Sequence, residues 1–260
     1  MIIDSLTHVT PDGRWFSTPY DASETRLLQE MDAHGVDKAI VVALADYIEN
    51  DFVEIVCKRH TDRLIPGASI NPVAYATHKQ AAEQARSIVS EGLFPVLKLH
   101  PRLHRYDVSD SRCLAVLEAM EESGSSTCVW LDTLLRYRGA LLRKPPIDAV
   151  HDLVGRFTSL KFVLLHSCGA DILRLAEAIR DCPNAFLDIS YTLPRYRGSS
   201  VELDLKYLLQ TFEQRMVFGS DFPEVSIPEA LGEFESLSKG IPYDKRSRVL
   251  EKNLGEILGI

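Results

Sequence analysis

The stretch Met216-Val217-Phe218-Gly219-Ser220-Asp221 carries the pattern on which the fold of this chain depends. A short apolar run stops at a glycine and is followed by an acidic side chain. The same layout occurs four more times upstream, where an apolar run ends in a histidine or an aspartate: His8, His100, Asp132 and His166. If these runs are parallel neighbours in one barrel, their polar ends converge on one face, and that face is an active site.

Apolar, β-rich runs alternate with helical periodicity along the whole chain. The runs are short and nearly uniformly apolar, as strands buried on both faces are. We expect eight strands, at 2–3, 38–44, 64–70, 95–99, 127–131, 161–165, 185–189 and 215–218. Helices are expected at about 23–34, 46–60, 75–91, 109–122, 147–157, 170–180, 201–210 and 228–237, with a last one at 243–258.

Eight strands, each followed by a helix, predict an α/β fold of the (β/α)8 TIM barrel type. The 260 residues agree with the roughly 250 typical of that fold, and we expect a single barrel domain over residues 1–260. A doubly wound open sheet is the alternative, but no glycine-rich phosphate loop follows the first predicted strand. The longest loops, at 11–22, 133–146 and 191–200, leave strand ends where barrel enzymes contact their substrates.

Composition and charge narrow the classes of partner. The 29 lysines and arginines against 37 aspartates and glutamates give a net charge of −8, which argues against nonspecific binding to nucleic acid or to an anionic membrane. The longest apolar run, 39–45, is far shorter than the roughly 20 residues that span a bilayer. Five scattered cysteines and an N-terminus without a signal pattern predict a cytoplasmic protein with reduced thiols. The sequence leaves the oligomeric state open, with a homodimer as one option.

Three basic stretches lie in the predicted loops. They are Arg136-Tyr137-Arg138, Arg143-Lys144 and Arg195-Tyr196-Arg197. One interpretation is that they are solvated loop charges. The other is that they surround the mouth of a site that takes an anionic small-molecule substrate.

Asp221 and His166 are the predicted catalytic residues. Asp221 is expected to bind a metal or to take a proton from water, while His166 polarises a carbonyl. Imidazole and carboxylate groups at one pocket also suit a hydrolytic metal such as Zn²⁺, which lowers the pKa of bound water to about 7. Both routes place a nucleophilic water against a carbonyl carbon, and sequence spacing does not separate them.

Further polar residues occur at the predicted strand ends. Lys98 and His100 are expected to bind substrate, although Lys98 is alternatively a carbamylated metal bridge or a salt-bridged rim lysine. Asp132 is either a metal ligand or substrate contact, or a loop cap. Asp4 is expected to be a structural hydrogen-bonding residue, and Cys168 to belong to a tight turn rather than to act as a nucleophile.

Six motifs follow one another along nearly the whole chain: Ile2-Ile3-Asp4…His8, Gly35-Val36-Asp37-Lys38-Ala39, Lys98-Leu99-His100-Pro101, His166…Gly169, Gly219-Ser220-Asp221-Phe222-Pro223 and Asn253-Leu254. In this order they resemble the amidohydrolase superfamily and specifically the amidohydrolase-related group that includes aminocarboxymuconate-semialdehyde decarboxylase. The resemblance implies a barrel with a divalent metal, usually zinc, held by His8 and Asp221, with His166 as the proton-transfer or carbonyl-polarising residue.

The chain departs from the pattern of that family at two positions. The first strand of the family carries His-x-His, where this chain has Leu6-Thr7-His8, and the fifth strand ends in a histidine ligand, where this chain has Asp132. A carboxylate can replace an imidazole as a ligand, whereas Leu6 cannot. A site made of His8, Asp132 and Asp221 is therefore expected to bind zinc more weakly or differently. Some relatives hydrolyse lactones without a metal, and the two losses favour that route.

The leading hypothesis is a hydrolase that acts on a small-molecule lactone, amide or related carbonyl bond. Asp221 takes a proton from the attacking water and His166 supports the developing oxyanion. One alternative is a decarboxylase of the same fold, in which a metal and His166 assist protonation after loss of CO₂. Another is a barrel with a degenerate metal site that serves a binding or assembly role.

Overall fold

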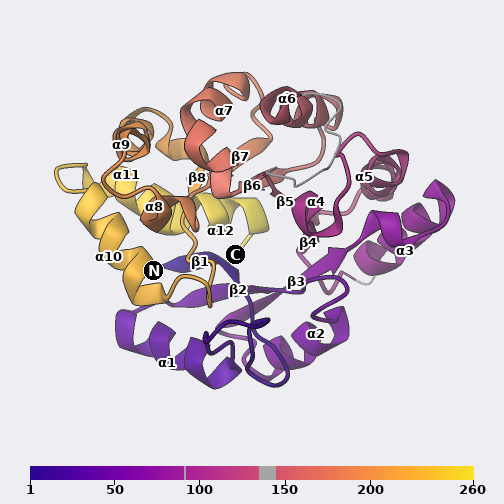
Figure 1. The fold of residues 1–260 in the computed structure, drawn as a ribbon, viewed down its shortest axis with the longest axis horizontal. Helices are drawn as coiled ribbons and strands as arrows, with labels where there is room; N and C mark the ends of the chain where they lie inside the picture. Colours follow the sequence, from indigo (N-terminus) through magenta and orange to yellow (C-terminus); the bar gives the residue numbers. More distant parts are fainter. Residues whose placement is uncertain (91, 135–144) are drawn as a thin grey trace.

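Eight parallel strands follow one another around a barrel in the computed structural model, which describes residues 1–90, 92–134 and 145–260 (Figure 1). Neighbours in the sheet are neighbours in the sequence, from β1 to β8. The predicted (β/α)8 TIM barrel is confirmed. The strands are Ile3–Thr7 (β1), Lys38–Val42 (β2), Leu64–Ile70 (β3), Val96–Leu99 (β4), Cys128–Asp132 (β5), Phe162–Leu165 (β6), Ala185–Asp188 (β7) and Met216–Val217 (β8).

The barrel closes where β1 meets the segment that follows β8. The Asp221 N–H donates to Leu6 O at 3.0 Å, and the His8 N–H donates to Phe222 O at 2.8 Å. Strand β8 itself has two residues, so these hydrogen bonds carry the pairing on toward the C-terminal end. The first and last parts of the chain therefore meet along one seam of the barrel.

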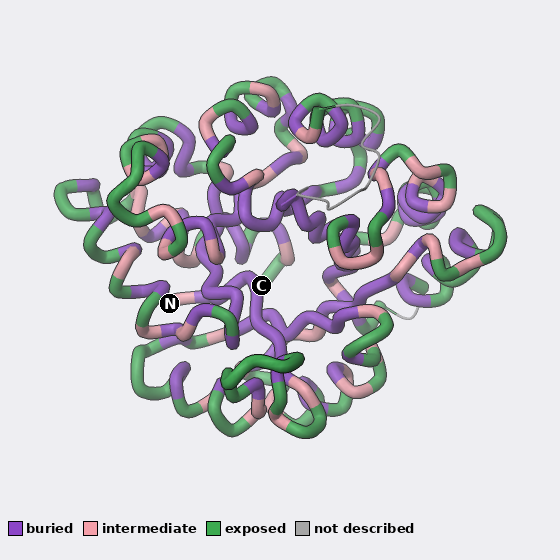
Figure 2. The backbone as a smooth tube through the Cα atoms, viewed as in Figure 1, coloured by how far each residue is buried: buried purple, intermediate pink, exposed green. Residues whose placement is uncertain are grey.

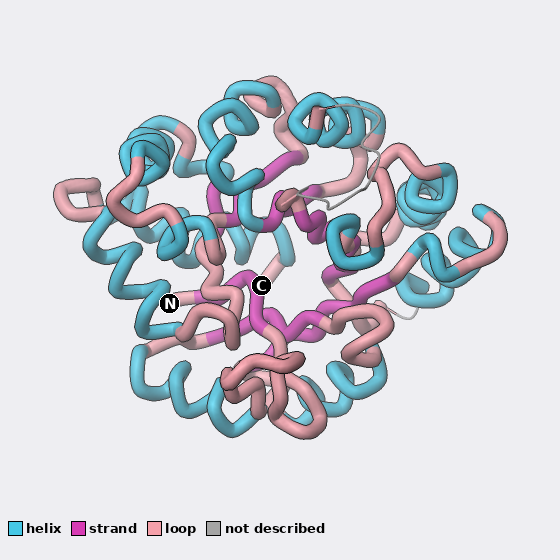
Figure 3. Tube along the Cα trace, viewed as in Figure 1, coloured by secondary structure: helices cyan, strands magenta, loops and turns pink. Residues whose placement is uncertain are grey.

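Helices surround the strands on the outside (Figure 3). None of the helices in the described ranges is long and apolar enough to cross a membrane. The main helices are Glu24–His34 (α1), Asn50–Arg59 (α2), His78–Ser90 (α3), Ser111–Ser123 (α5), Pro146–Arg156 (α6), Ile172–Ala178 (α7), Ser200–Thr211 (α9) and Ile227–Leu237 (α10). Short helices are Pro101–His104 (α4), Thr192–Arg195 (α8), Tyr243–Ser247 (α11) and Asn253–Leu258 (α12), and short 3-10 segments are Pro72–Ala74, His166–Asp171 and Glu213–Arg215.

Capping residues set the ends of several helices. The Ser23 side chain accepts a hydrogen bond from the Arg26 N–H and starts α1, and Gly35 ends that helix with φ of 67°. Ser226 starts α10 in the same way, with Pro228 in its first turn. The local sequence thus fixes where the chain leaves each helix and turns back toward the barrel.

Several elements differ from the sequence prediction. Helix α2 begins at Asn50 rather than at residue 46, because Asp46 has φ of 70° and residues 44–48 form a tight turn. The predicted last helix is interrupted by a π-helical segment, Arg248–Lys252. Helices α4 and α8 were not predicted, since a single turn is too short to give a periodic apolar pattern.

The core has two parts, one between strands and helices and one inside the barrel. The inner part contains alternate residues of neighbouring strands, such as Val96, Trp130 and Val163. Helix α12 packs across the N-terminal end of the strands, where Ile257 O accepts a hydrogen bond from Cys128 Sγ at the start of β5. Figure 2 shows the buried strands at the centre and exposed residues on the outer helices. The opposite, C-terminal end of the barrel carries the polar side chains.

Candidate active site

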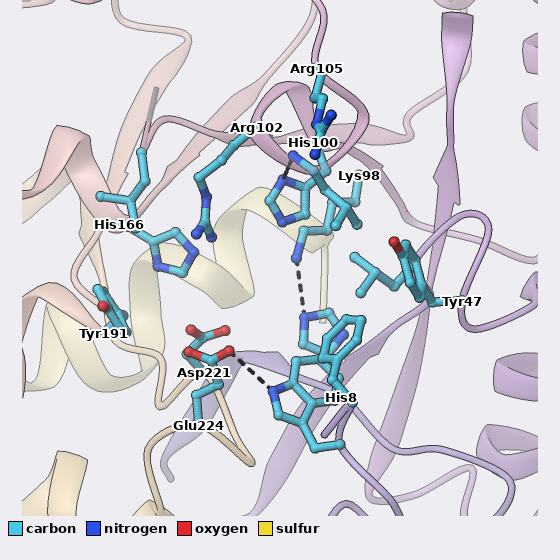
Figure 4. Close-up of a pocket in the computed structure, with 15 residues that line it drawn as sticks. His8, Tyr47, Lys98, His100, Arg102, Arg105, His166, Tyr191, Asp221 and Glu224 are labelled. Carbon is cyan, nitrogen blue, oxygen red and sulfur yellow. Dashed lines mark hydrogen bonds between the residues drawn. The ribbon is translucent and has the colours of Figure 1, made fainter. Parts of the chain in front are cut away.

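A cavity of about 370 Å³ lies at the C-terminal ends of the strands (Figure 4). The structure brings five of the six predicted site residues to its wall, and the sixth, Asp132, is fully buried and in contact with two of them. The five that line the cavity are His8, Lys98, His100, His166 and Asp221. The strand ends thus converge on one face of the barrel, as the sequence pattern predicts.

Asp132 is a buried carboxylate surrounded by nitrogen donors. Its Oδ2 lies 3.4 Å from His100 Nε2, 3.5 Å from His166 Nε2 and 3.4 Å from Arg102 Nη2. Burial alone would raise the pKa of Asp132, but these three neighbours hold it well below its usual range. Burial would lower the pKa of His166, yet Asp221 and Asp132 raise it. Asp132 therefore stays ionised and favours the imidazolium form of His166.

His166 lies on a strained turn directly after β6. Its φ is 60°, and residues 167–169 also have positive φ. Buried side chains hold this backbone: Asp188 Oδ1 accepts from the His166 N–H at 3.2 Å, and Thr192 Oγ1 donates to His166 O at 2.6 Å. The ring Nδ1 lies 3.2 Å from Ser190 O, to which it donates. The imidazole is thereby fixed both through its backbone and through its ring.

Asp221 is held by a second strained turn, after β8. Its φ is 72°, and a Cβ at Gly219 would lie 2.9 Å from Asp188 Oδ2, so glycine is required there. Asp4 Oδ1 accepts a hydrogen bond from the Ser220 N–H at 2.9 Å. Asp4 is therefore the structural hydrogen-bonding residue that was predicted, and its carboxyl helps to set the position of Asp221.

The environment of Asp221 shifts the pKa of its carboxyl to near neutral pH. Burial raises the pKa of the carboxyl to about 7, although His166 and Lys98 oppose this by electrostatic attraction. The charge of Glu224 acts in the same direction as burial. A carboxyl with this pKa can take a proton from water and release it again at neutral pH, which is the property of a general base.

His8 and Lys98 form a buried pair on the other side of the cavity. His8 Nδ1 donates to Val42 O at 2.6 Å, which leaves the lone pair on Nε2 to accept from Lys98 Nζ at 3.1 Å. The Trp15 ring stacks on the imidazole with 5.2 Å between centroids. Burial and the Lys98 charge hold the pKa of His8 well below its ordinary value. Burial also lowers the pKa of Lys98, against the attraction of nearby carboxylates.

Two arginines that the sequence patterns did not identify also line the cavity. Arg102 lies on α4, and Arg105 follows that helix with φ of 55°. Burial would lower the pKa of Arg102, but Asp132 raises it, so the guanidinium is a firm positive charge. A signal was available in the sequence, because Arg102 directly follows the strand-end motif Lys98-Leu99-His100-Pro101 and Arg105 lies three residues further on.

Aromatic side chains form one wall at the mouth of the cavity. Trp15 meets Phe16 edge to face with ring centroids 4.8 Å apart, and Phe16 meets Tyr47 in the same way at 5.1 Å. Trp15 Nε1 donates to Glu224 Oε1 at 3.1 Å, which ties this wall to the loop after β8. Trp15 and Phe16 belong to the first long predicted loop, but nothing in the local sequence indicates that they turn toward the site.

The three basic stretches and Cys168 do not contribute side chains to the cavity among the described residues. The stretches Arg136-Tyr137-Arg138 and Arg143-Lys144 lie outside the described residues. In Arg195-Tyr196-Arg197, Arg197 pairs with Glu233 at 2.7 Å, and none of the three lines the cavity. Burial raises the pKa of the Cys168 thiol to about 12, so the thiol is protonated and Cys168 belongs to the tight turn.

The residues present do not fit the predicted metal site. Leu6 is buried and offers no donor atom, the His8 lone pair accepts from Lys98, and Asp132 is engaged by two imidazoles and a guanidinium. Within residues 1–90, 92–134 and 145–260, no group of three or more His, Cys, Asp or Glu side chains is placed to hold a metal ion. The ligand set His8, Asp132 and Asp221 stays a prediction.

Several solved structures share this fold. An uncharacterized TIM-barrel protein from Bordetella bronchiseptica is 21% identical, with a TM-score of 0.83 over 99% of this chain and 98% of the other. A probable 2-pyrone-4,6-dicarboxylic acid hydrolase from Acinetobacter baumannii, solved with citric acid, is 14% identical, with a TM-score of 0.70 over 100% and 99% of the two chains. A 5-carboxyvanillate decarboxylase from Novosphingobium aromaticivorans, solved with manganese and a nitrobenzoic acid, is 13% identical, with a TM-score of 0.68 over 100% and 96%.

Comparison with protein families gives a match over nearly the full length of the chain. A search of curated proteins finds no match. The family described as amidohydrolase matches residues 3–260, a range that contains every strand of the barrel and every cavity residue named above. The chain therefore belongs to the amidohydrolase family.

Proposed function

We propose that this protein hydrolyses a small anionic lactone, amide or related carbonyl compound. The observation that carries the proposal is the pair Asp221 and His166, which lines the cavity with a carboxyl of pKa about 7 and an imidazole of raised pKa. A base and a cationic hydrogen-bond donor are the two groups that attack of water on a carbonyl requires. Both are held by strained turns, so their positions are set before substrate binds.

The proposed reaction uses the residues in two steps. Asp221 takes a proton from water while the water oxygen bonds to the carbonyl carbon and the carbonyl π electrons move onto oxygen. His166, kept cationic by Asp132, stabilises that oxygen. The bond to the leaving oxygen or nitrogen then breaks, and the leaving atom takes the proton from Asp221. Asp221 returns to its ionised form, and the products are a carboxylic acid and an alcohol or amine.

The charges at the cavity wall favour a substrate that is itself an anion. Arg102 and Arg105 line the cavity together with Lys98, and guanidinium groups match carboxylates in geometry. The cavity volume of about 370 Å³ suits a small molecule. The similar hydrolase from Acinetobacter baumannii has a dicarboxylic acid in its name, which is consistent with this substrate class.

Decarboxylation of a carboxylate substrate is the second candidate. The observation that favours it is the same cationic wall, together with the similarity to a 5-carboxyvanillate decarboxylase. In that reaction protonated Asp221 or His166 would donate a proton to the carbon that loses CO₂. The hydrolase is preferred because the raised pKa of Asp221 suits activation of water.

The test is a substrate panel in ¹⁸O-labelled water. Lactones, esters and amides with and without a carboxylate are incubated with the purified protein, and aryl carboxylates are included with detection of CO₂. We expect ¹⁸O in the product acid, faster turnover of the carboxylated members, and no CO₂. Release of CO₂ without hydrolysis would replace the proposal by the decarboxylase. Binding of panel compounds without any turnover would favour the binding role instead.

We further expect the enzyme to act in the cytoplasm. All five cysteines are free thiols, and four of them are buried. A reducing compartment keeps such thiols unmodified.

A further inference from the structure

We propose that the Lys98 ammonium occupies the position beside His8 that a metal ion would need, and that it is the electrophile of this site, donating a hydrogen bond to the substrate carbonyl oxygen. The catalytic part of this inference rests on the proposed hydrolysis, whereas the positional part does not. The inference also explains why a metal fits this site poorly, because the Lys98 ammonium lies where the metal would bind.

The first support is the geometry of His8. A metal binds an imidazole through the nitrogen lone pair. Val42 O fixes the proton on Nδ1, so that the lone pair lies on Nε2, and Lys98 Nζ lies 3.1 Å from it. The dashed line between the two side chains in Figure 4 marks this hydrogen bond. The ammonium therefore uses the coordination site of the imidazole.

The second support is the set of groups around the pair. Leu6, near the end of β1 and two residues before His8, is buried in the apolar cluster inside the barrel. On the other side, the Arg102 guanidinium lies 3.4 Å from Asp132 and adds a second positive charge at the cavity wall. Two positive charges repel a divalent cation, while they attract the carboxylates of Asp132 and Asp221. The positive charge in the cavity therefore comes from the side chains of Lys98 and Arg102.

The third support is the way β4 presents Lys98. The residue pairs in register with Ser69 on β3 and Trp130 on β5, and Trp130 belongs to the inner core. The side chain is 2% exposed, so its stem lies within the barrel and its ammonium group reaches the cavity. An ammonium has three N–H donors, and His8 takes one of them. Within residues 1–90, 92–134 and 145–260 no other acceptor is bonded to this ammonium, so its remaining N–H groups can serve a substrate oxygen in a site of low dielectric constant.

In the proposed hydrolysis, Lys98 acts when the water oxygen bonds to the carbonyl carbon. The negative charge that develops on the carbonyl oxygen is stabilised by an N–H of Lys98 from one side and by His166 from the other. Lys98 does not transfer its proton, and no bond to it forms or breaks. Removal of one such donor from an oxyanion site lowers kcat by about 10²- to 10³-fold.

The test combines zinc binding with turnover in three variants. Lys98→Met removes the charge and the donor, Lys98→Gln removes the charge but can still donate to His8, and Lys98→Arg retains the charge. Lys161→Met is the matched control, since Lys161 donates to Ile257 O at the far end of the barrel. Near-ultraviolet circular dichroism checks that each variant folds. Zinc affinity is measured by equilibrium dialysis against zinc chloride with elemental analysis.

We expect Lys98→Met and Lys98→Gln to bind zinc at least about tenfold more tightly than wild type, because a like charge is removed. Lys98→Arg and Lys161→Met should match wild type. Equal zinc affinity in wild type and both neutral variants would overturn the positional claim. In turnover, Lys98→Met should lose about 10²- to 10³-fold in kcat with little change in KM, and full kcat would overturn the electrophilic role. If wild type hydrolyses nothing, the proposed function fails, while the zinc comparison still decides where the ammonium lies.

Discussion

The two sides of the cavity hold their functional groups in different ways. On the side of β6 and β8, His166 and Asp221 lie on turns with positive φ whose backbone is bound by buried aspartates. On the side of β1 and β4, Lys98 extends from a regular strand and is positioned by a hydrogen bond to the His8 ring. The β6/β8 side therefore positions its groups through a strained backbone. The β1/β4 side positions Lys98 through side-chain contacts.

This difference indicates which side suits proton transfer and which suits stabilisation of charge. Proton transfer depends steeply on geometry, so a base and its partner benefit from a rigid backbone. Stabilisation of charge requires a donor in a site of low dielectric constant, and a flexible stem packed inside a barrel provides it. We therefore expect substitutions on the β6/β8 side to affect the chemical step most, and substitutions near the mouth to affect binding.

The largest expected effect is that of Asp221→Asn. Asparagine keeps the size of the side chain but cannot take a proton, so kcat should fall by about 10³- to 10⁴-fold while the fold is retained. Activity on the responsive members of the substrate panel and near-ultraviolet circular dichroism measure the two properties. Glu224→Gln, in the same cavity, is the matched control and should lose less than about tenfold, because Glu224 is not the base. Wild-type turnover in Asp221→Asn would remove the basis of the proposed mechanism.

The next effect is the dependence of kcat/KM on pH. Asp221 must be deprotonated to act as a base, so with its pKa of about 7 the rate should fall about tenfold per pH unit below neutrality and level off above it, until His166 loses its proton at higher pH. Glu224→Gln should move this midpoint to lower pH, because the negative charge of Glu224 raises the pKa of Asp221. A rate–pH profile of both proteins measures the shift. A midpoint that moves upward would show that another group controls the rate.

A smaller effect concerns stability and the contrast between two buried carboxyls. Asp4 also has a pKa raised by burial from 3.8 to about 7, but it does not line the cavity. The folded state thus retains a proton that the unfolded state releases near pH 4. Stability from this group is complete below that pH and is lost as the pH rises through about 7. Asp221 contributes with the same sign.

As the pH rises from 5 to 7, Asp4 and Asp221 should each lower the free energy of unfolding of wild type by an amount on the order of 1–2 kcal/mol. Asp4→Asn removes one of these two contributions, so the loss of stability over this pH range should be about half as large. Asparagine can still accept from the Ser220 N–H, so the turn should persist. Urea unfolding at several pH values gives the free energies. An unchanged slope in Asp4→Asn would mean that the Asp4 carboxyl is ionised in the folded protein at pH 5.

The smallest effect is expected at the mouth of the cavity. Arg105 is exposed and lines the wall, so Arg105→Gln should raise KM for a carboxylated substrate by about threefold to tenfold without changing kcat. A neutral substrate of the same size is the control, and its KM should stay constant. If kcat falls and KM does not, Arg105 acts on the chemical step and the division between the two sides of the cavity has to be redrawn.

The sequence predicted the barrel and the convergence of its polar strand ends, because both follow from local patterns. Apolar runs such as 64–70 mark strands, and a polar residue at the end of each run must lie on one face once the strands are parallel. The hydrogen bond between His8 and Lys98 was not predictable, since it joins the residue after β1 to β4, which is not a neighbour of β1 in the sheet. Arg102, on the single-turn helix α4, and Trp15, in a loop, were also missed, because neither segment has a periodicity that indicates the direction of its side chains.

The seam between β1 and the segment after β8 has a consequence for the synthesis of the protein. Asp221 and His8 are brought together by the same backbone hydrogen bonds that join the two ends of the sheet. A nascent chain on the ribosome can fold its first strands and helices, but it lacks the segment that completes the pocket until residues 218–222 have left the ribosome. Catalytic competence should therefore appear abruptly once this segment has been made, rather than growing with chain length.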